Sequence, residues 1–253
     1  MKESKDIPAC LSAFDPISLE ELGASALMDR VETKFILSVL QLPELLEQLY
    51  ADYSVLEVSG KRISSYQTAY LDTEALHCYH EHHRRRKKRY KLRFRKYVDS
   101  DLNFFELKRK DNGRIDKRRM QLESDVAQLG DTEAGFLQRA GIDPSGWKQK
   151  LLNRYQRITL VSKHQAERVT LDLNIEFSHN GVDEQLGDLV ILELKQAKAS
   201  RKTAVYKALR RQQIRPFNIS KYCIGLIKIH GQEKLKHNRF KNKLMKIDKI
   251  NHA

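Results

Sequence analysis

The segment 168–177 alternates polar and apolar side chains without a break. Because successive side chains of a β-strand point to opposite faces of a sheet, this pattern predicts a strand with one polar and one apolar face. Such strands are typical of an antiparallel sheet. The polar positions are Arg168, Thr170, Asp172, Asn174 and Glu176, and the apolar positions are Val169, Leu171, Leu173, Ile175 and Phe177.

Four other segments alternate in the same way, and their polar positions are mostly charged. These positions are Arg30, Glu32 and Lys34; Lys91, Arg93 and Arg95; Glu106, Lys108 and Lys110; and Glu193 and Lys195. One interpretation is a solvated outer face on a conventional core. The other is a barrel with its charges inward, which requires a lumen that holds water and a multiply charged anion. Periodicity alone leaves both interpretations open.

The order of predicted elements indicates one α+β domain built on a barrel or sandwich. There is no internal repeat and no Gly/Ser or Pro-rich linker, and Asp111-Asn112-Gly113 is a strong hairpin signal. Strand patterns occur at 31–37, 54–59, 63–72, 90–97, 102–110, 115–122, 150–162, 168–177 and 188–196, and helical patterns at 18–27, 42–50, 73–83, 125–140 and 201–213.

The charge balance points to an anionic partner. The 253 residues carry 47 Lys and Arg against 33 Asp and Glu, a formal net charge of +14. A field of this sign attracts nucleic acid, anionic lipid, nucleotides or phosphate chains. Between Arg84 and Lys96, ten of thirteen residues are basic, but Tyr90 and Phe94 are the only aromatic residues there, which makes a nucleic-acid surface the least favoured interpretation.

Other classes of protein are excluded by the absence of their signals. No apolar run is long enough to span a bilayer, and the first twenty residues lack a signal-peptide core. Cys10, Cys78 and Cys223 are too far apart for a disulfide framework or a structural zinc site. We therefore expect a cytoplasmic protein with reduced thiols.

Nine short motifs, in order along the chain, resemble the polyphosphate polymerase (VTC) domain of the triphosphate tunnel metalloenzymes. They are R-V-E-T-K-F at 30–35, Y-L-D-T at 70–73, K-L-R-F-R-K-Y at 91–97, F-E-L-K-R-K at 105–110, K-R-R at 117–119, R-Y-Q-R at 154–157, R-V-T-L-D at 168–172, L-E-L-K at 192–195 and S-K-Y-C at 220–223. The resemblance implies an N-terminal segment at 1–16, a tunnel domain at 17–230 and a basic C-terminal tail at 231–253.

The resemblance also implies a closed, eight-stranded antiparallel β-barrel flanked by helices, with its basic residues inside. Carried over position by position, the catalytic set is Arg93, Arg95, Lys108 and Arg157. Further phosphate or nucleotide contacts are Lys34, Lys117, Tyr155, Ser220 and Lys221, together with Arg119 and Arg168. Glu193 is the expected ligand for Mn²⁺ or Mg²⁺, with support from Glu32 and Glu106.

The implied activity is transfer of the γ-phosphate of ATP to a growing inorganic polyphosphate chain. The related CYTH phosphatases begin with E-x-E-x-K, and Arg30 stands at the first glutamate here, which favours the polymerase. A tunnel triphosphatase and a non-catalytic polyanion-binding module are the alternatives. A membrane-protein partner, and with it a location at the inner face of a membrane, stays open.

Two further segments call for an interpretation. The run 77–83 contains four histidines and one cysteine, and a solvated helix end is favoured there over a metal site. The tail from Lys234 carries Leu235, Phe240, Leu244 and Ile247 among basic residues. A helix packed on the barrel or a frayed terminus is favoured over a helix on an anionic membrane.

Overall fold

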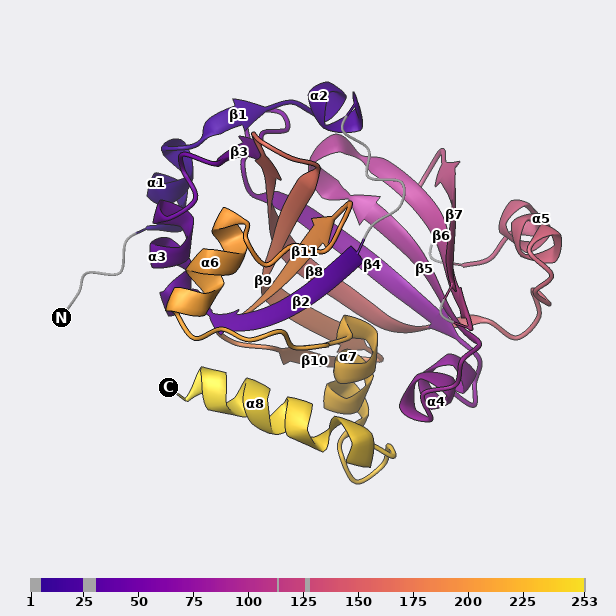
Figure 1. Ribbon diagram of the computed structural model, residues 1–253. Coiled ribbons are helices and arrows are strands. Elements are labelled where there is room, and N and C mark those ends of the chain that lie inside the picture. Colours follow the sequence, from indigo (N-terminus) through magenta and orange to yellow (C-terminus); the bar gives the residue numbers. More distant parts are fainter. Residues whose placement is uncertain (1–5, 25–30, 113, 126–127, 253) are drawn as a thin grey trace.

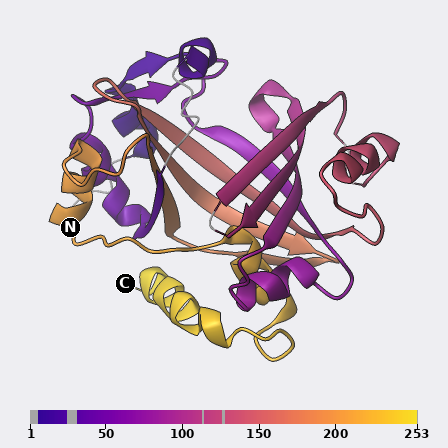
Figure 2. The same cartoon turned by 45° about the vertical axis from the view of Figure 1, so that its right-hand side comes forward.

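The alternating segments form strands of one curved sheet (Figures 1 and 2). The computed structural model describes residues 6–24, 31–112, 114–125 and 128–252. The strands are β1 (Asp15–Ile17), β2 (Val31–Ser38), β3 (Tyr53–Leu56), β4 (Ser64–Asp72), β5 (Arg89–Tyr97), β6 (Leu102–Asp111), β7 (Arg114–Leu122), β8 (Lys148–Ser162), β9 (Glu167–His179), β10 (Val182–Gln185) and β11 (Leu189–Gln196).

Eight strands form the main path of the sheet, in the order β2-β11-β9-β8-β4-β5-β6-β7. Every neighbouring pair along this path is antiparallel. A large antiparallel sheet is therefore confirmed, although it has 11 strands in all, with β1, β3 and β10 attached beside the main path. Its closure is not confirmed, because the described residues show no backbone pairing between the end strands β2 and β7.

The helices lie around the sheet (Figure 1). They are α1 (Ile7–Ser12), α2 (Leu19–Ala24), α3 (Leu42–Glu47), α4 (His77–His83), α5 (Asp131–Arg139), α6 (Ala204–Arg211), α7 (Lys221–His230) and α8 (Lys241–Asn251). None of the helices in the described part of the chain is long and apolar enough to cross a membrane.

Most apolar side chains of the strands face outward, toward the helices. The alternation predicted for 168–177 is interrupted at Asn174, which has a positive φ of 50° beside an irregularity in the pairing of β8 and β9, so that Ile175 and Phe177 turn to the inner face instead. Phe35, Leu171 and Leu192 share a buried cluster with residues of α1, α3 and α6. Phe94 and Phe105 share another with Leu137 of α5. Because the apolar faces are used in these contacts, the charged positions must lie on the opposite, inner face of the curved sheet. The inward interpretation of the charged strands is the correct one.

Helix α7 packs against part of the inner face. A Cβ atom added to Gly225 would lie 2.6 Å from side-chain atoms of both Leu151 and Phe177, so α7 approaches the sheet closely at this glycine. Leu151 pairs with Tyr70, which in turn pairs with Arg93, so all three share the inner face. Helix α7 therefore covers one part of the inner face, and the charged part of that face lies beside the helix.

The C-terminal tail is helical and packed. Leu244 and Ile247 of α8 are buried in the same cluster as α7, and α8 contacts β2 and β11. The predicted packing of the tail on the barrel is confirmed, and these apolar side chains serve the core rather than a membrane surface.

The pattern at 201–213 is confirmed as α6, whereas α5 starts at Asp131, later than predicted, and residues 126–127 lie outside the described residues.

Helices α1 and α7 and the short strands β1 and β10 were not predicted from the sequence. Helix α7 was not predicted because Ile224, Leu226 and Ile227 are buried together with its cysteine and tyrosine, so that no polar stripe marks the helical period in the sequence. Residues 25–30, which hold the end of the first predicted helix and Arg30, lie outside the described residues.

Candidate active site

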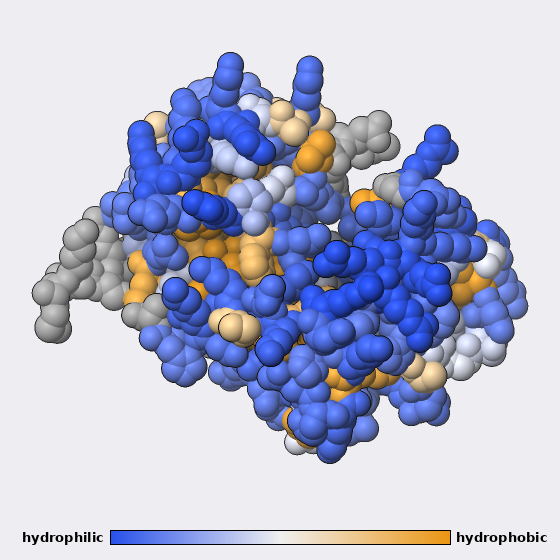
Figure 3. Space-filling view, turned by 60° about the horizontal axis from the view of Figure 1, so that its bottom comes forward, coloured by the Kyte–Doolittle hydropathy of each residue, from blue (hydrophilic) through white to orange (hydrophobic). Residues whose placement is uncertain are grey.

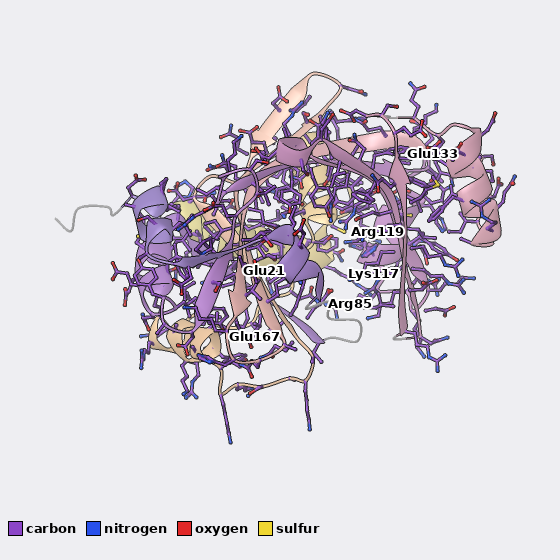
Figure 4. The ribbon with its side chains drawn as sticks, turned by 90° about the horizontal axis from the view of Figure 1, so that it is seen from above. Glu21, Arg85, Lys117, Arg119, Glu133 and Glu167 are labelled. Carbon is purple, nitrogen blue, oxygen red and sulfur yellow. The ribbon has the colours of Figure 1, made fainter. Side chains whose placement is uncertain are left out.

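The strand register brings the charged faces together on the inner side of the sheet. Arg93 pairs with Glu106, which pairs in turn with Arg119, and Lys108 pairs with Lys117. Toward the other end of the strand order, Glu193 pairs with Lys34, and Arg157 pairs with Asp172. Figure 4 shows Lys117 and Arg119 on the side of β7 that faces the other strands. Cross-strand partners share a face, so these residues form one polar surface.

Four carboxylates on this surface are each shared by two cations. They are Glu193 with Lys34 and Lys195, Glu32 with Lys108 and Lys117, Glu106 with Arg93 and Arg95, and Asp172 with Arg157 and Lys221. Eight cations against four carboxylates leave an excess of four positive charges. A surface this basic and this enclosed is suited to a ligand with several negative charges, such as a triphosphate.

The paired side chains remain within reach of water. The exposed fractions of the eight cations run from 11% for Arg95 to 42% for Lys117, whereas the apolar faces of the same strands are buried. Arg95 Nε and Thr170 Oγ1 are buried with no hydrogen-bond partner among the described residues. Buried polar atoms normally have a partner. These two atoms are therefore unused hydrogen-bonding groups on the inner face.

The ion pairs keep the carboxylates charged. Burial raises the pKa of Glu106, but Arg93 and Arg95 outweigh it and lower the pKa to about 2. The pKa of Glu32 is likewise about 2, because Lys108 and Lys117 outweigh burial and the nearby charge of Glu193. All of these groups stay ionised at neutral pH.

A second group of cations surrounds Tyr155. Lys221 Nζ lies 3.7 Å from the centre of the Tyr155 ring, and the Arg157 guanidinium carbon lies 5.3 Å from it. Burial raises the pKa of Tyr155, but Arg95, Arg157 and Lys221 lower it to about 8. The phenol therefore loses its proton more easily than an ordinary tyrosine does, and it donates a strong hydrogen bond while protonated.

Asp172 is the main residue that sequence reasoning left unassigned. Its carboxylate accepts hydrogen bonds from Arg157 Nε at 2.5 Å and Nη2 at 2.8 Å, and from Lys221. It thereby orients two of the predicted phosphate ligands, which come from strand and helix segments far apart in sequence. Its place on the polar face of 168–177 was the available signal. Lys195, which contacts Glu193 at 3.1 Å, was missed in the same way.

Most of the predicted site residues lie on the inner face, and three of them take less central positions. Ser220 caps α7 by accepting a hydrogen bond from the backbone N–H of Cys223, and it also accepts one from Lys91. Arg119 is exposed and lies over the ring of Phe104, 5.1 Å from its centre. Arg168 donates to the backbone carbonyl of Leu22 at 3.4 Å.

The predicted metal ligands differ in their surroundings. Glu32 and Glu193 lie close enough for their charges to interact, and both form their ion pairs with lysine ammonium groups. Two carboxylates fit a hard divalent cation that takes its other ligands from phosphate oxygens and water. Glu106 is held by two arginines instead. The described residues contain no group of three His, Cys, Asp or Glu side chains arranged for a metal, which includes 77–83.

A family model decides the relationship of this chain to known proteins. The model described as the VTC domain matches residues 29–230. The chain belongs to the VTC domain family. This match includes every predicted site residue, and it ends at the last residue of α7, so that α8 lies outside it. A search of curated proteins gives no significant match.

Among the solved structures that resemble this chain, one with a TM-score above 0.5 shows the same fold. A putative adenylyl cyclase from Hippeastrum, described as having a dominant triphosphatase activity, is 13% identical with a TM-score of 0.51, and the match covers 78% of this chain and 94% of that one. A putative adenylate cyclase from Bacillus halodurans is 16% identical with a TM-score of 0.49, covering 76% and 94%. A Pyrococcus horikoshii protein is 17% identical with a TM-score of 0.45, covering 78% and 95%.

Proposed function

We propose that this VTC domain is a metal-dependent polyphosphate polymerase, which transfers the γ-phosphate of ATP to the end of an inorganic polyphosphate chain. The observation that carries the proposal is the excess of four positive charges on a partly enclosed surface. Both substrates are polyanions, and the transition state of phosphoryl transfer spreads negative charge over the transferring group. Family membership supports the same activity.

The residues on the inner face would act by position and charge. Arg93, Arg95, Lys108 and Arg157 would hold the transferring phosphoryl group, as an electrostatic clamp. The chain-terminal phosphate is already anionic near neutral pH, so its oxygen attacks the γ-phosphorus without a strong general base, and ADP leaves. The neighbouring phosphates would contact Lys34, Lys117, Tyr155, Ser220 and Lys221, with Arg119 and Arg168 at the margins.

Each carboxylate in the proposed site has a role in placing these cations. Asp172 would keep Arg157 and Lys221 at fixed positions when the ligand is absent, and Glu106 would do the same for Arg93 and Arg95. Preorganised charge of this kind needs no rearrangement during the reaction. Glu193 and Glu32 would hold Mn²⁺ or Mg²⁺, which when bound neutralises charge on the phosphate oxygens.

A triphosphatase is the second candidate. The Hippeastrum protein shares the fold and is described as having a dominant triphosphatase activity. The same clamp would serve water as the acceptor in place of a phosphate chain. Water, unlike the chain-terminal phosphate, is not already anionic, so this reaction would also need a group that accepts the proton of the attacking water.

Sizing the products made from ATP and Mn²⁺ by the purified protein tests the proposal. We expect long phosphate chains and ADP, a rate loss of about 10²-fold or more in Arg93→Ala, and a near-normal rate in Arg118→Ala. Arg118 is a matched control because its side chain pairs with Asp116 on the outer side of β7. Orthophosphate as the only product would replace the polymerase with the triphosphatase, and binding without turnover would indicate a polyanion-binding module.

A further inference from the structure

A basic pocket lies outside the inner face of the sheet, where the end of α4 meets the segment between α7 and α8. Its volume is about 230 Å³, and because one water occupies about 30 Å³ of liquid, a phosphate group fits there together with several waters. The family model ends at residue 230, so half of this pocket belongs to a segment beyond the matched domain. The residues that line it are His80, His83, Arg84, Lys236, Asn238 and Arg239.

Contacts between α4 and the segment 236–240 hold the pocket in shape. Tyr79 Oη donates a hydrogen bond to the backbone carbonyl of Lys236 at 2.9 Å. Arg239 Nη1 donates to the backbone carbonyl of His83 at 3.2 Å. The rings of Tyr79, His83 and Phe240 pack together, with their centres 5.8–6.3 Å apart. The pocket is therefore formed before any ligand arrives.

The lining offers hydrogen-bond donors that the protein leaves unused. Asn238 Oδ1 lies 2.7 Å from His83 Nε2 and accepts its hydrogen bond, so the amide nitrogen of Asn238 keeps its N–H groups for another partner. Within the described part of the chain, Lys236 and Arg239 form no ion pair. Arg84 has only a long contact of 3.7 Å with Glu81, which lies outside the lining.

The positive charge exceeds what the end of α4 requires. Cations near the C-terminal end of a helix interact favourably with its last carbonyl groups, and Arg239 makes such a contact. Helix α4 has only seven residues, and Lys236 and Arg84 remain as further cations. Burial lowers the pKa of His83, and the charges of Arg239 and Lys236 lower it further, against the opposing effect of the hydrogen bond to Asn238. The pocket thus lacks a counter-ion.

Further cations lie between this pocket and the proposed phosphate contacts on α7. Lys243 Nζ lies 5.5 Å from the centre of the Phe240 ring, and Lys243 is also close to Arg85 and to Cys223. Cys223 follows Lys221 by two residues on α7. Hydrophilic side chains cover this face of the molecule (Figure 3). A phosphate chain that leaves the inner face beside α7 therefore meets positive charge on its way to the pocket.

We propose that this pocket is a second phosphate site, which holds a distal phosphate group of a polyphosphate chain outside the inner face. Ionised phosphate oxygens accept hydrogen bonds, so they match a lining of cations and amide N–H groups. The inference rests on the proposed function for the identity of the chain. It adds that a growing chain stays attached at a second point after each transfer, which favours long products.

Nuclear magnetic resonance of the histidine rings, recorded on the full chain without metal and at constant ionic strength, tests the inference. The signals of His83, assigned by their loss in His83→Gln, report on the pocket. We expect inorganic phosphate to shift these signals until they saturate. A long polyphosphate chain should do so at a lower phosphate concentration, because binding on the inner face brings its other phosphates close to the pocket. Arg93→Ala should reduce only this advantage of the chain.

Lys236→Met and Arg84→Met should each weaken binding of both ligands at His83 several-fold. Lys249→Met is the matched control, because it removes the same charge from an exposed position near the far end of α8. Equal effects of Lys236→Met and Lys249→Met, or a parent whose His83 signals do not saturate, would overturn the inference. Equal concentrations of free and chain phosphate at saturation would replace the distal chain site with a site for free phosphate.

The polymerase proposal fails separately from this inference. A parent that binds the long chain at His83 but makes no chains from ATP would contradict the polymerase and leave the second phosphate site in place. With a working polymerase, we expect Lys236→Met to release shorter products than the parent and Lys249→Met, while the initial rate of ADP formation is unchanged. Products of equal length in all three proteins would show that the pocket does not retain the growing chain.

Discussion

Lys117 Nζ on β7 lies 2.8 Å from Glu32 Oε1 on β2, and this ion pair joins the two end strands of the sheet. Lys108 of β6 approaches the other Glu32 oxygen at 3.6 Å. In the described residues, side chains therefore connect the two edges at a place where the main chain does not. The same lysines are proposed phosphate ligands, so one carboxylate both links the edges and holds cations for the substrate.

Replacing Lys117 by methionine should loosen the connection between the end strands. We expect faster hydrogen exchange at the amides of β7, with a loss of only about 0.5 kcal/mol in global stability because the pair is partly exposed. Exchange measured by mass spectrometry checks this, with Arg118→Met as the control on the other face of the same strand. Identical exchange in both variants would show that the Glu32 contact does not secure β7.

Replacing Glu193 by glutamine should separate metal binding from phosphate binding. Without metal, the negative charge of Glu193 is shared with Lys34 and Lys195, and a divalent cation held at Glu193 would add positive charge for the phosphate oxygens. We therefore expect Glu193→Gln to lose turnover while it binds triphosphate as tightly as the metal-free parent. Calorimetry with and without Mn²⁺ measures both effects. Normal metal-dependent turnover in the variant would make Glu193 a structural residue. Glu176→Gln is the control, because beyond the irregularity at Asn174 the Glu176 side chain faces outward and accepts a hydrogen bond from Gln185, so this variant should behave like the parent.

Tyr155 should ionise at a lower pH than other tyrosines. Absorbance of tyrosinate should show a group that titrates near pH 8 in the parent and disappears in Tyr155→Phe. Tyr66→Phe is the control, because burial raises the pKa of Tyr66 to about 12. The folded-state pKa of Tyr155 lies below the ordinary 10.0, so its contribution to stability is full above about pH 10 and is lost as the pH falls through about 8.

The basic run after α4 should affect the capture of substrate more than the chemical step. Arg85 and Lys87 are exposed, and the face that carries α4, α7 and α8 is largely hydrophilic (Figure 3). We expect Arg85→Ala/Lys87→Ala to lower kcat/KM several-fold at low salt and little at high salt, with kcat unchanged. Lys207→Ala/Arg210→Ala on α6 removes the same charge elsewhere and should have little effect. A matching loss of kcat would place the run in the active site.

The strands were predictable because each carries its own two-residue period. Segment 168–177 identifies β9, and the same reasoning places Glu193 and Lys195 on one face of β11. Whether the charged face of a strand points into the curved sheet or out to solvent depends on which elements cover its apolar face. The alternation of the sequence is identical in the two cases. The contacts of Phe94 and Phe105 with α5 show that the charged face points inward, and these contacts join residues far apart in sequence.

The pairing of charges could not be predicted in the same way. Asp172 was visible as a polar position, but its contact with Lys221 depends on how α7 packs against the sheet, and α7 has no amphipathic pattern. The connection between Glu32 and Lys117 depends on how far the sheet curls, which is the sum of small twists over eight strands. Neither relation is local, so no short window of sequence contains it.

Gly225 affects the position of the proposed phosphate ligands on α7, because it sets how closely this helix packs against the sheet. Any side chain there would collide with Leu151 and Phe177 and push α7 away from the sheet. The N-terminal end of the same helix carries Ser220 and Lys221, so this displacement would also separate Lys221 from Asp172 and Ser220 from Lys91. A methyl group added at a position remote from any phosphate would therefore appear in an assay as a loss of substrate affinity.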